Sequence, residues 1–338
     1  MRRHGVLLLL LLLPGCDRLI DRQIERAMTR VDRAMLTSPD LTVVLCGTGS
    51  PLPDRNRASA CTAVVAGGEL FLVDVGPGAW KSLDLANVPT SALSAVLLTH
   101  FHSDHIGDLG EAVMQSWVAG RTRPLEVYGP PGTARVVDGF TAAYAQDVGY
   151  RVAHHGEAAL PRALGTAIAR EVPLDAAPDA SAVVVDRNGL RVTMFRVDHA
   201  PVSPAVGYRF DWHGRSVVVS GDTRKSESVI RHAAGADLLV HEALNRDLMG
   251  RAAAVAERLG NPRLAKLARD TLGYHTSPVE AAEVAQAAGV KHLVLTHLVP
   301  GPPNRFVGRL FRAGMSDRFH GEITLGEDGM RFALSPAS

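Results

Sequence analysis

Cysteine, aromatic side chains and net charge are all scarce in this sequence of 338 residues. It holds only 3 cysteines, none spaced as C-x-x-C, so a zinc site built from thiolates is not expected. Lysine and arginine number 36 against 35 acidic residues, and the formal charge of +1 excludes a long basic surface of the kind that binds nucleic acid. Apolar residues make up 46% of the chain, which excludes a wholly disordered protein.

Long hydrophobic runs are also missing. Val6–Leu13 has eight apolar residues, whereas a membrane-spanning helix needs roughly 20. Two arginines precede this run, so residues 1–16 are predicted to be a signal peptide. Its end, Leu13-Pro14-Gly15-Cys16, resembles the lipobox of bacterial lipoproteins. That resemblance implies a lipidated Cys16 and an exported protein on the periplasmic side of a bacterial membrane; a plain signal peptide or a misassigned start is the alternative.

Residues 17–40 are predicted to form an amphipathic helical linker, because apolar residues recur at helical spacing among arginines: Ile20, Ile24, Met28, Val31 and Met35. The helix either lies on anionic lipid beside the anchor or packs on the main domain, and both interpretations stay open. Cys46 and Cys61 either form a disulfide in an exported protein or stay buried thiols.

Short apolar runs alternate with helical patterns over residues 41–335, which predicts an α/β domain of layered architecture. Strands are expected at 41–46, 61–66, 69–75, 95–99, 125–128, 182–185, 190–196, 205–211, 216–220, 237–240 and 292–296. Helices are expected at 107–119, 131–146, 246–259, 262–273 and 278–288. The last has the clearest start, with Ser277 as N-cap and Glu280 completing a capping box.

Histidine is plentiful by contrast, with 14 in the chain. The segment LTHFHSDH places four potential metal ligands within six residues directly after a predicted strand: His100, His102, Asp104 and His105. A loop at a strand end can turn several side chains towards one point, and neutral imidazoles with a carboxylate suit Zn²⁺. His199, Asp222 and His297 also follow or end predicted strands. Together these seven residues are enough for two metals that share a carboxylate.

The H-x-H-x-D-H loop and the order of these motifs resemble the metallo-β-lactamase superfamily over about residues 41–335. The resemblance implies a four-layer αββα sandwich of two similar halves, consistent with the strand ends AVLLTH at 95–100 and HLVLTH at 292–297. It further implies two zinc ions, with Mn²⁺ or Fe as alternatives. His100, His102 and His199 would hold one metal, Asp104, His105 and His297 the other, and Asp222 would bridge them. Asp74 would orient the ligand loop.

Within the superfamily the chain looks most similar to the ribonuclease Z-like and arylsulfatase-type branch. GTGSPLP, the GDT around Asp222, His241-Glu242-Ala243 and His275-Thr276-Ser277 carry this resemblance, and residues 117–132 are similar to arylsulfatase-type members. His275 is the candidate general acid, oriented by Glu242, and Asp104 is counted among the catalytic residues. His241 is expected to be structural, and His154 and His155 to lie in a solvent-facing loop.

The expected reaction is hydrolysis of a small sulfate or phosphate ester outside the cytoplasm, with no nucleic acid as partner. Ribonuclease Z enzymes carry an arm between the motifs matching His199 and Asp222, and only 22 residues separate these positions here. Residues 246–273 are instead expected to form a helical insertion, and we interpret it as a lid over a small pocket.

Other functions remain as alternatives. A ribonuclease Z-type phosphodiesterase or a lactonase would share the same metal site. A di-iron redox protein on the same fold is a non-hydrolase alternative, disfavoured by Asp104 and by the lack of a flavin-binding domain. A non-catalytic binding protein is less expected because no ligand is missing. Superfamily relatives often dimerise, so a homodimer is possible.

Overall fold

A computed structural model describes residues 14–337 of the chain. The predicted signal peptide falls largely on residues 1–13, outside the described residues. In the described part, no helix is both long and apolar enough to cross a membrane. The expectation of export therefore stays a prediction.

Two seven-stranded mixed sheets form the centre of the fold. The first has the order β14 (Arg331–Leu334), β1 (Leu41–Gly47), β2 (Cys61–Ala66), β3 (Glu69–Val73), β4 (Leu93–Leu97), β5 (Leu125–Gly129) and β6 (Ala167–Glu171). The second has the order β13 (Glu322–Leu325), β12 (His292–Val299), β11 (Leu238–Leu244), β10 (Arg215–Val219), β9 (Val202–Trp212), β8 (Leu190–His199) and β7 (Ser181–Arg187). The last strand thus returns to pair with β1 in the first sheet.

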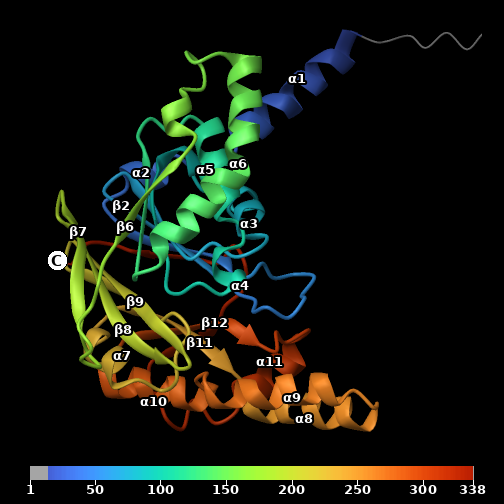
Figure 1. The fold of residues 1–338 in the computed structure, drawn as a ribbon, viewed down its shortest axis with the longest axis vertical. Helices are drawn as coiled ribbons and strands as arrows, with labels where there is room; N and C mark the ends of the chain where they lie inside the picture. The colour runs from blue at the N-terminus through green and yellow to red at the C-terminus, as the bar shows by residue number, and fades with distance from the viewer. Residues whose placement is uncertain (1–13, 338) are drawn as a thin grey trace, which may run out of the picture.

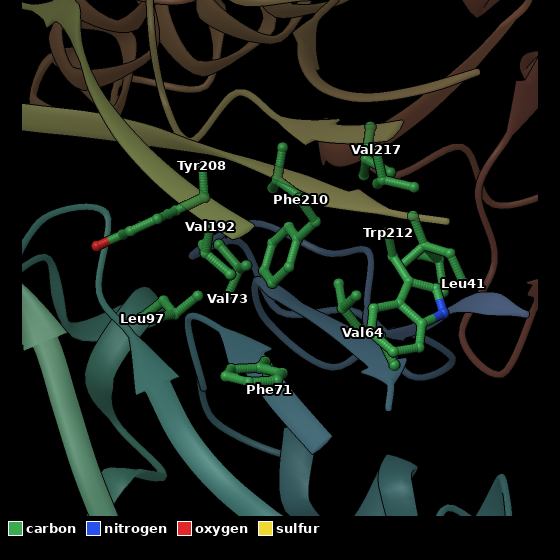
Figure 2. Close-up of a cluster of buried hydrophobic side chains, with 14 of the residues drawn as sticks. Leu41, Val64, Phe71, Val73, Leu97, Val192, Tyr208, Phe210, Trp212 and Val217 are labelled. Atoms are coloured by element: carbon green, nitrogen blue, oxygen red, sulfur yellow. The ribbon is translucent and has the colours of Figure 1, made fainter. Parts of the chain in front are cut away.

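The main core lies between the two sheets. Inward-facing side chains from both sheets form one buried cluster, in which the rings of Phe71 on β3 and Phe210 on β9 meet edge to face at 6.1 Å (Figure 2). Central strands such as β1 are buried on both faces, which explains their continuous apolar sequence.

Helices cover the outer face of each sheet (Figure 1). A second buried cluster packs beneath helices of the first half: α2 (Ala34–Thr37), α3 (Ala79–Leu85), α4 (Ser103–Ile106), α5 (Leu109–Val118) and α6 (Thr133–His155). A third packs beneath helices of the second half: α7 (Glu227–His232), α10 (Pro278–Ala288) and α11 (Arg305–Phe311). The four-layer helix–sheet–sheet–helix arrangement confirms the expected architecture.

Helices α8 (Arg246–Arg258) and α9 (Pro262–Asp270) form an antiparallel pair beside the second sheet, close to the expected ranges (Figure 1). Asn245 and Asn261 cap them by accepting hydrogen bonds from the backbone N–H groups of Leu248 and Leu264. The inner face of the pair packs in a small cluster around Met249. The capping box at Ser277 and Glu280 is also present at the start of α10.

Two sequence expectations on helices differ from the structure. The expected helix over residues 17–35 is divided into α1 (Pro14–Met28) and α2, because the ion pairs Arg30–Asp84 and Arg331–Asp32 tie the intervening segment to the domain. Along α1 the described side chains are exposed, whereas Met35 on α2 is buried. His154 and His155 are exposed as expected, but they lie in the last turn of α6 rather than in a loop.

Candidate metal centre

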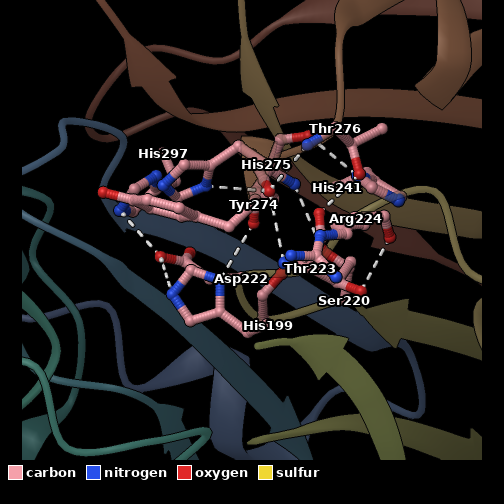
Figure 3. Close-up of polar contacts among 12 residues, drawn as sticks. His199, Ser220, Asp222, Thr223, Arg224, His241, Tyr274, His275, Thr276 and His297 are labelled. Atoms are coloured by element: carbon pink, nitrogen blue, oxygen red, sulfur yellow. Dashed lines mark hydrogen bonds and ion pairs between the residues drawn. The ribbon is translucent and has the colours of Figure 1, made fainter. Parts of the chain in front are cut away.

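All seven predicted metal ligands meet at one edge of the sandwich. His100 and His102 follow β4, and Asp104 and His105 lie on the short helix α4, so this half of the set comes from the first sheet. His199 ends β8, Asp222 follows β10 and His297 lies in β12, so the other half comes from the second sheet (Figure 3). The centre is therefore built where the two sheets face each other.

Asp222 lies at the middle of the cluster. Its Oδ2 is 3.3 Å from Nε2 of His105, 3.4 Å from Nε2 of His297, 3.8 Å from Nε2 of His199 and 3.9 Å from Nε2 of His100. Every one of these side chains is buried. This position is the one expected of a carboxylate shared between two metals.

Besides a set made of Asp222, His275 and His297, the cluster offers two further sets of possible ligands. In one, potential ligand atoms of His100, His102, His199 and Asp222 lie within 4.8 Å of one another. In the other, those of Asp104, His105 and His297 do so. This division matches the two ligand sets that the family resemblance implies.

Several polar atoms of the cluster are buried without any hydrogen-bond partner: Nε2 of His105, Nε2 of His199, Nδ1 of His297 and Oδ1 of Asp222. Leaving one such group unpaired costs about 1–3 kcal/mol. Divalent cations at the centre would satisfy Nε2 of His105 and Nε2 of His199, which lie closest to the Asp222 carboxylate, and imidazole and carboxylate donors suit zinc. The residues present therefore fit a binuclear metal site.

Asp74 orients the ligand loop, as expected. Its Oδ2 accepts hydrogen bonds from Nδ1 of His105 at 2.7 Å and from the hydroxyl of Thr99 at 2.7 Å. Its Oδ1 accepts one from the backbone N–H of Thr99 at 2.8 Å. Asp74 adopts a left-handed φ of 59° and His297 one of 45°, conformations that a non-glycine residue adopts only where its surroundings hold it.

Protonation of the histidines differs across the centre. Burial holds the pKa of His100 well below its usual range, and burial also lowers the pKa of His199. Burial has the same tendency at His105, but the adjacent carboxylates of Asp222 and Asp74 outweigh it and hold the pKa of His105 well above its usual range. The low pKa values of His100 and His199 favour neutral imidazoles, the form that binds metal.

His275 and Glu242 form a buried pair beside the ligands. Nδ1 of His275 lies 3.0 Å from Oε1 of Glu242, and this oxygen also accepts hydrogen bonds from the backbone N–H groups of Thr276 and Thr223. Burial lowers the pKa of His275, but the Glu242 carboxylate outweighs burial and raises it to about 9. His275 therefore carries a proton on both ring nitrogens at neutral pH. His241 is fully buried and its Nδ1 contacts the backbone oxygen of Glu242.

A pocket of about 200 Å³ opens over the centre. His102, Asp104, Asp222, His275 and His297 reach it from the metal side. Its other walls are largely apolar and come from α8, α9, the end of β12 and two loops: Leu52, Met249, Leu264, Leu267, Ala268, Tyr274 and Val299. The α8–α9 pair thus shapes the entrance to the centre.

Tyr274 lies at the candidate centre, although the sequence did not single it out. Its backbone oxygen lies 3.0 Å from Nδ1 of His199 and leaves Nε2 of that ring for a metal. Its ring lines the pocket next to His275. In the sequence, only its position directly before His275 pointed to the site. Its contact with His199 is made by a backbone oxygen, which every residue type has, so the sequence could not predict that contact.

Comparison with known proteins identifies the family. A model described as a β-lactamase superfamily domain matches residues 70–298. Ribonuclease Z of Mycobacterium bovis (strain BCG / Pasteur 1173P2) is 39% identical over 301 residues, covering 88% of this chain and 99% of that protein. Ribonuclease Z of Mycolicibacterium gilvum (strain PYR-GCK) is 40% identical over 300 residues, covering 88% and 97%.

Solved structures share the fold. The short form of human tRNase Z has a TM-score of 0.62 at 23% identity, covering 87% of this chain and 99% of that one. The metallo-β-lactamase fold protein YhfI of Bacillus subtilis has a TM-score of 0.58 at 22% identity, with coverage of 87% and 99%. At this level of identity, the likeness concerns the fold.

One sequence expectation is wrong. A small-molecule ester was expected as substrate and nucleic acid was excluded, but the relatives at 39–40% identity are named ribonuclease Z, and these names support no arylsulfatase assignment. The formal charge of +1 was a poor guide to the substrate, because it sums all charges of the chain and does not show where they lie. The chain belongs to the metallo-β-lactamase superfamily as a metal-dependent hydrolase, and ribonuclease Z proteins are among its homologues.

Proposed function

We propose that this chain is a ribonuclease Z-type phosphodiesterase that cleaves RNA, with the 3′ end of precursor tRNA as its substrate. The observation that carries the proposal is near-full-length identity of 39% with a protein named ribonuclease Z, in a chain whose candidate centre lacks none of the expected ligands. Structures named for tRNase Z share the same fold.

The two ligand sets would hold two zinc ions. His100, His102 and His199 would bind one ion, Asp104, His105 and His297 the other, and Asp222 both. When bound, such ions polarise a phosphoryl oxygen and lower the pKa of water to about 7. The buried ligands and the Asp74 contacts hold the donors in place beforehand, so little reorganisation is needed when metal and substrate bind.

His275 would donate a proton to the leaving oxygen. A ribose alkoxide is a far stronger base than a phenolate, so cleavage of RNA depends more on a proton donor than cleavage of an aryl ester does. The pKa of about 9 keeps His275 protonated at neutral pH. Glu242 would hold the ring in its hydrogen-bonded orientation through Nδ1, which leaves Nε2 on the opposite side of the ring.

A test uses zinc-loaded protein and a precursor tRNA transcript with a 3′ extension. We expect one endonucleolytic cut, seen as two bands on a denaturing gel, and loss of cleavage in the His102→Ala variant. Mature tRNA serves as the control for non-specific degradation. Protein that carries both metals and leaves the precursor intact would contradict the proposal.

A further inference from the structure

The short helix α11 carries an unusual concentration of positive charge. Arg305 and Arg309 lie on it and Arg312 directly follows it, at the spacing that places side chains along one helix face. Asn304 caps the helix by accepting a hydrogen bond from the backbone N–H of Val307. The helix itself contains no acidic residue.

These arginines line a groove of about 690 Å³, the α11 groove. The groove is also lined by one further arginine and by three acidic residues: Arg57, Asp54, Glu327 and Asp328. Asp328 is already engaged with the backbone N–H groups of Thr48 and Ala58. Among the described residues, no ion pair joins Asp54, Glu327 or Asp328 to an α11 arginine.

Among the described residues, Arg305, Arg309 and Arg312 have no carboxylate within 4.0 Å of their guanidinium groups, and Nε of Arg312 is buried without a hydrogen-bond partner. Arginines elsewhere are commonly paired: Arg187 with Glu69 and Arg246 with Glu280 are examples. A row of unpaired guanidinium groups attracts an anion with several charges along its length.

Apolar side chains are exposed on the same helix. Phe306 is 69% exposed and Leu310 is 49% exposed. Neither side chain lines the groove, so both lie beside it. An exposed aromatic ring next to a row of arginines is a combination by which proteins bind single-stranded RNA, since bases stack on the ring while the phosphates contact the cations.

The groove adjoins the catalytic pocket through two segments of chain. Pro51 and Leu52 line the pocket, and residues 54–57 of the same loop line the groove. Val299 lines the pocket, and residues 302–305 of the same connection line the groove. A strand bound at the metals would therefore need only a few nucleotides to reach α11.

The place of an arm is taken by a hairpin, since β9 and β10 occupy the stretch between His199 and Asp222.

We propose that the α11 groove binds the backbone of the substrate RNA beside the scissile phosphate, with Arg305 and Arg309 on phosphates and Phe306 stacked on a base. This inference rests on the proposed function, because it assigns the RNA contact surface of that same site.

The test compares two double variants. Arg305→Gln/Arg309→Gln removes two charges from α11, and Arg22→Gln/Arg26→Gln removes two exposed charges at the same spacing from α1, at the opposite end of the molecule (Figure 1). We measure KM for precursor tRNA, kcat/KM for bis(p-nitrophenyl) phosphate, and the Kd of fluorescent RNA over a range of salt concentrations in a His275→Ala background.

We expect the α11 variant to raise KM and Kd for RNA about tenfold, and to lower the slope of log Kd against log salt by about 1.4, at roughly 0.7 for each phosphate contact. Turnover of the small diester should stay unchanged. Phe306→Ala should weaken RNA binding about tenfold with an unchanged salt slope. The α1 variant should behave like the unmodified protein.

The outcomes separate the two ideas. An α11 variant that binds RNA as tightly as the unmodified protein at every salt concentration overturns the groove assignment and leaves the proposed function standing. Equal losses in the α11 and α1 variants also overturn it, because they reflect net charge alone. An unmodified protein that neither binds nor cleaves RNA overturns the proposed function, and the groove assignment with it.

Discussion

Nδ1 of His275 lies 3.0 Å from Oε1 of Glu242, and both side chains are buried. The carboxylate is fixed by two backbone N–H groups, so it holds the imidazole in one orientation. This contact links α10, which follows His275, to the strand β11 that carries Glu242. It holds a protonated imidazole beside the predicted metal ligands.

The first prediction concerns this donor. His275→Gln should lower kcat for RNA by about 10²- to 10⁴-fold, the usual contribution of a general acid. Metal content, measured by mass spectrometry of the purified protein, should remain that of the unmodified enzyme. If metal is lost together with activity, His275 serves the metals rather than the leaving group.

The second prediction concerns pH. The Glu242 carboxylate raises the pKa of His275 to about 9, so activity that depends on protonated His275 falls as pH rises through that region. Glu242→Gln removes the charge while burial continues to disfavour the imidazolium, so the alkaline limb of the kcat profile should move to lower pH. An unmoved alkaline limb would show that another group controls it.

The third prediction concerns Asp74. Asp74→Asn weakens the contact to Nδ1 of His105 and should reduce metal affinity about 10- to 100-fold, as measured by competition with a chromogenic chelator. Excess zinc should restore most of the activity. Asp84→Asn, at a surface carboxylate, is the control and should bind metal normally.

The fourth prediction concerns the pocket wall. Leu264 and Leu267 are about half exposed and line the pocket over the metals. Their joint replacement by alanine should raise KM for RNA by about tenfold, because roughly 25 cal/mol of binding is lost for each Å² of apolar contact. Leu259→Ala, directly after α8, removes a more exposed leucine that does not line the pocket. Equal KM values in all three proteins would show that substrate does not contact α9.

The fifth prediction concerns Cys46 and Cys61, which form a disulfide between β1 and β2. A bond that closes a loop of this length stabilises a protein by about 3 kcal/mol. The Cys46→Ala/Cys61→Ala variant should lose about that much free energy of unfolding in a urea titration and keep its kcat. A variant as stable as the oxidised protein would mean that packing, not the covalent bond, supports these strands.

The metal centre could be predicted from the sequence because its ligands are histidine and aspartate side chains, which are recognisable by residue type. His100, His102, Asp104 and His105 stand almost side by side in the chain. The distant candidates stood at the ends of predicted strands, and the family resemblance divided the set between two metals. The sequence could not predict that Oδ2 of Asp222 lies within 4 Å of four imidazoles. That arrangement depends on how the two sheets pack against each other.

Three strands were not predicted: β6, β13 and β14. These strands lie at the edges of the two sheets, and their side chains are mostly half-buried or exposed, so their sequences lack the apolar runs of the central strands. Central strands such as β12 were predicted because they are buried almost throughout.

The choice of substrate failed for a different reason. A formal charge of +1 describes the sum over the chain, whereas the binding of phosphates depends on which charges lie unpaired at one place. Most acidic residues that form ion pairs do so away from α11, so a neutral total is compatible with a local row of cations. This distribution is visible only once the chain is folded.

The division of ligands between the two sheets also bears on how the protein unfolds. His100, His102 and His105 belong to the first half of the sandwich, and Asp222 and His297 to the second. Ions bound between them would cross-link the halves in addition to the core that both sheets share. Metal-loaded protein should therefore resist thermal unfolding better than stripped protein, while both unfold in one cooperative transition.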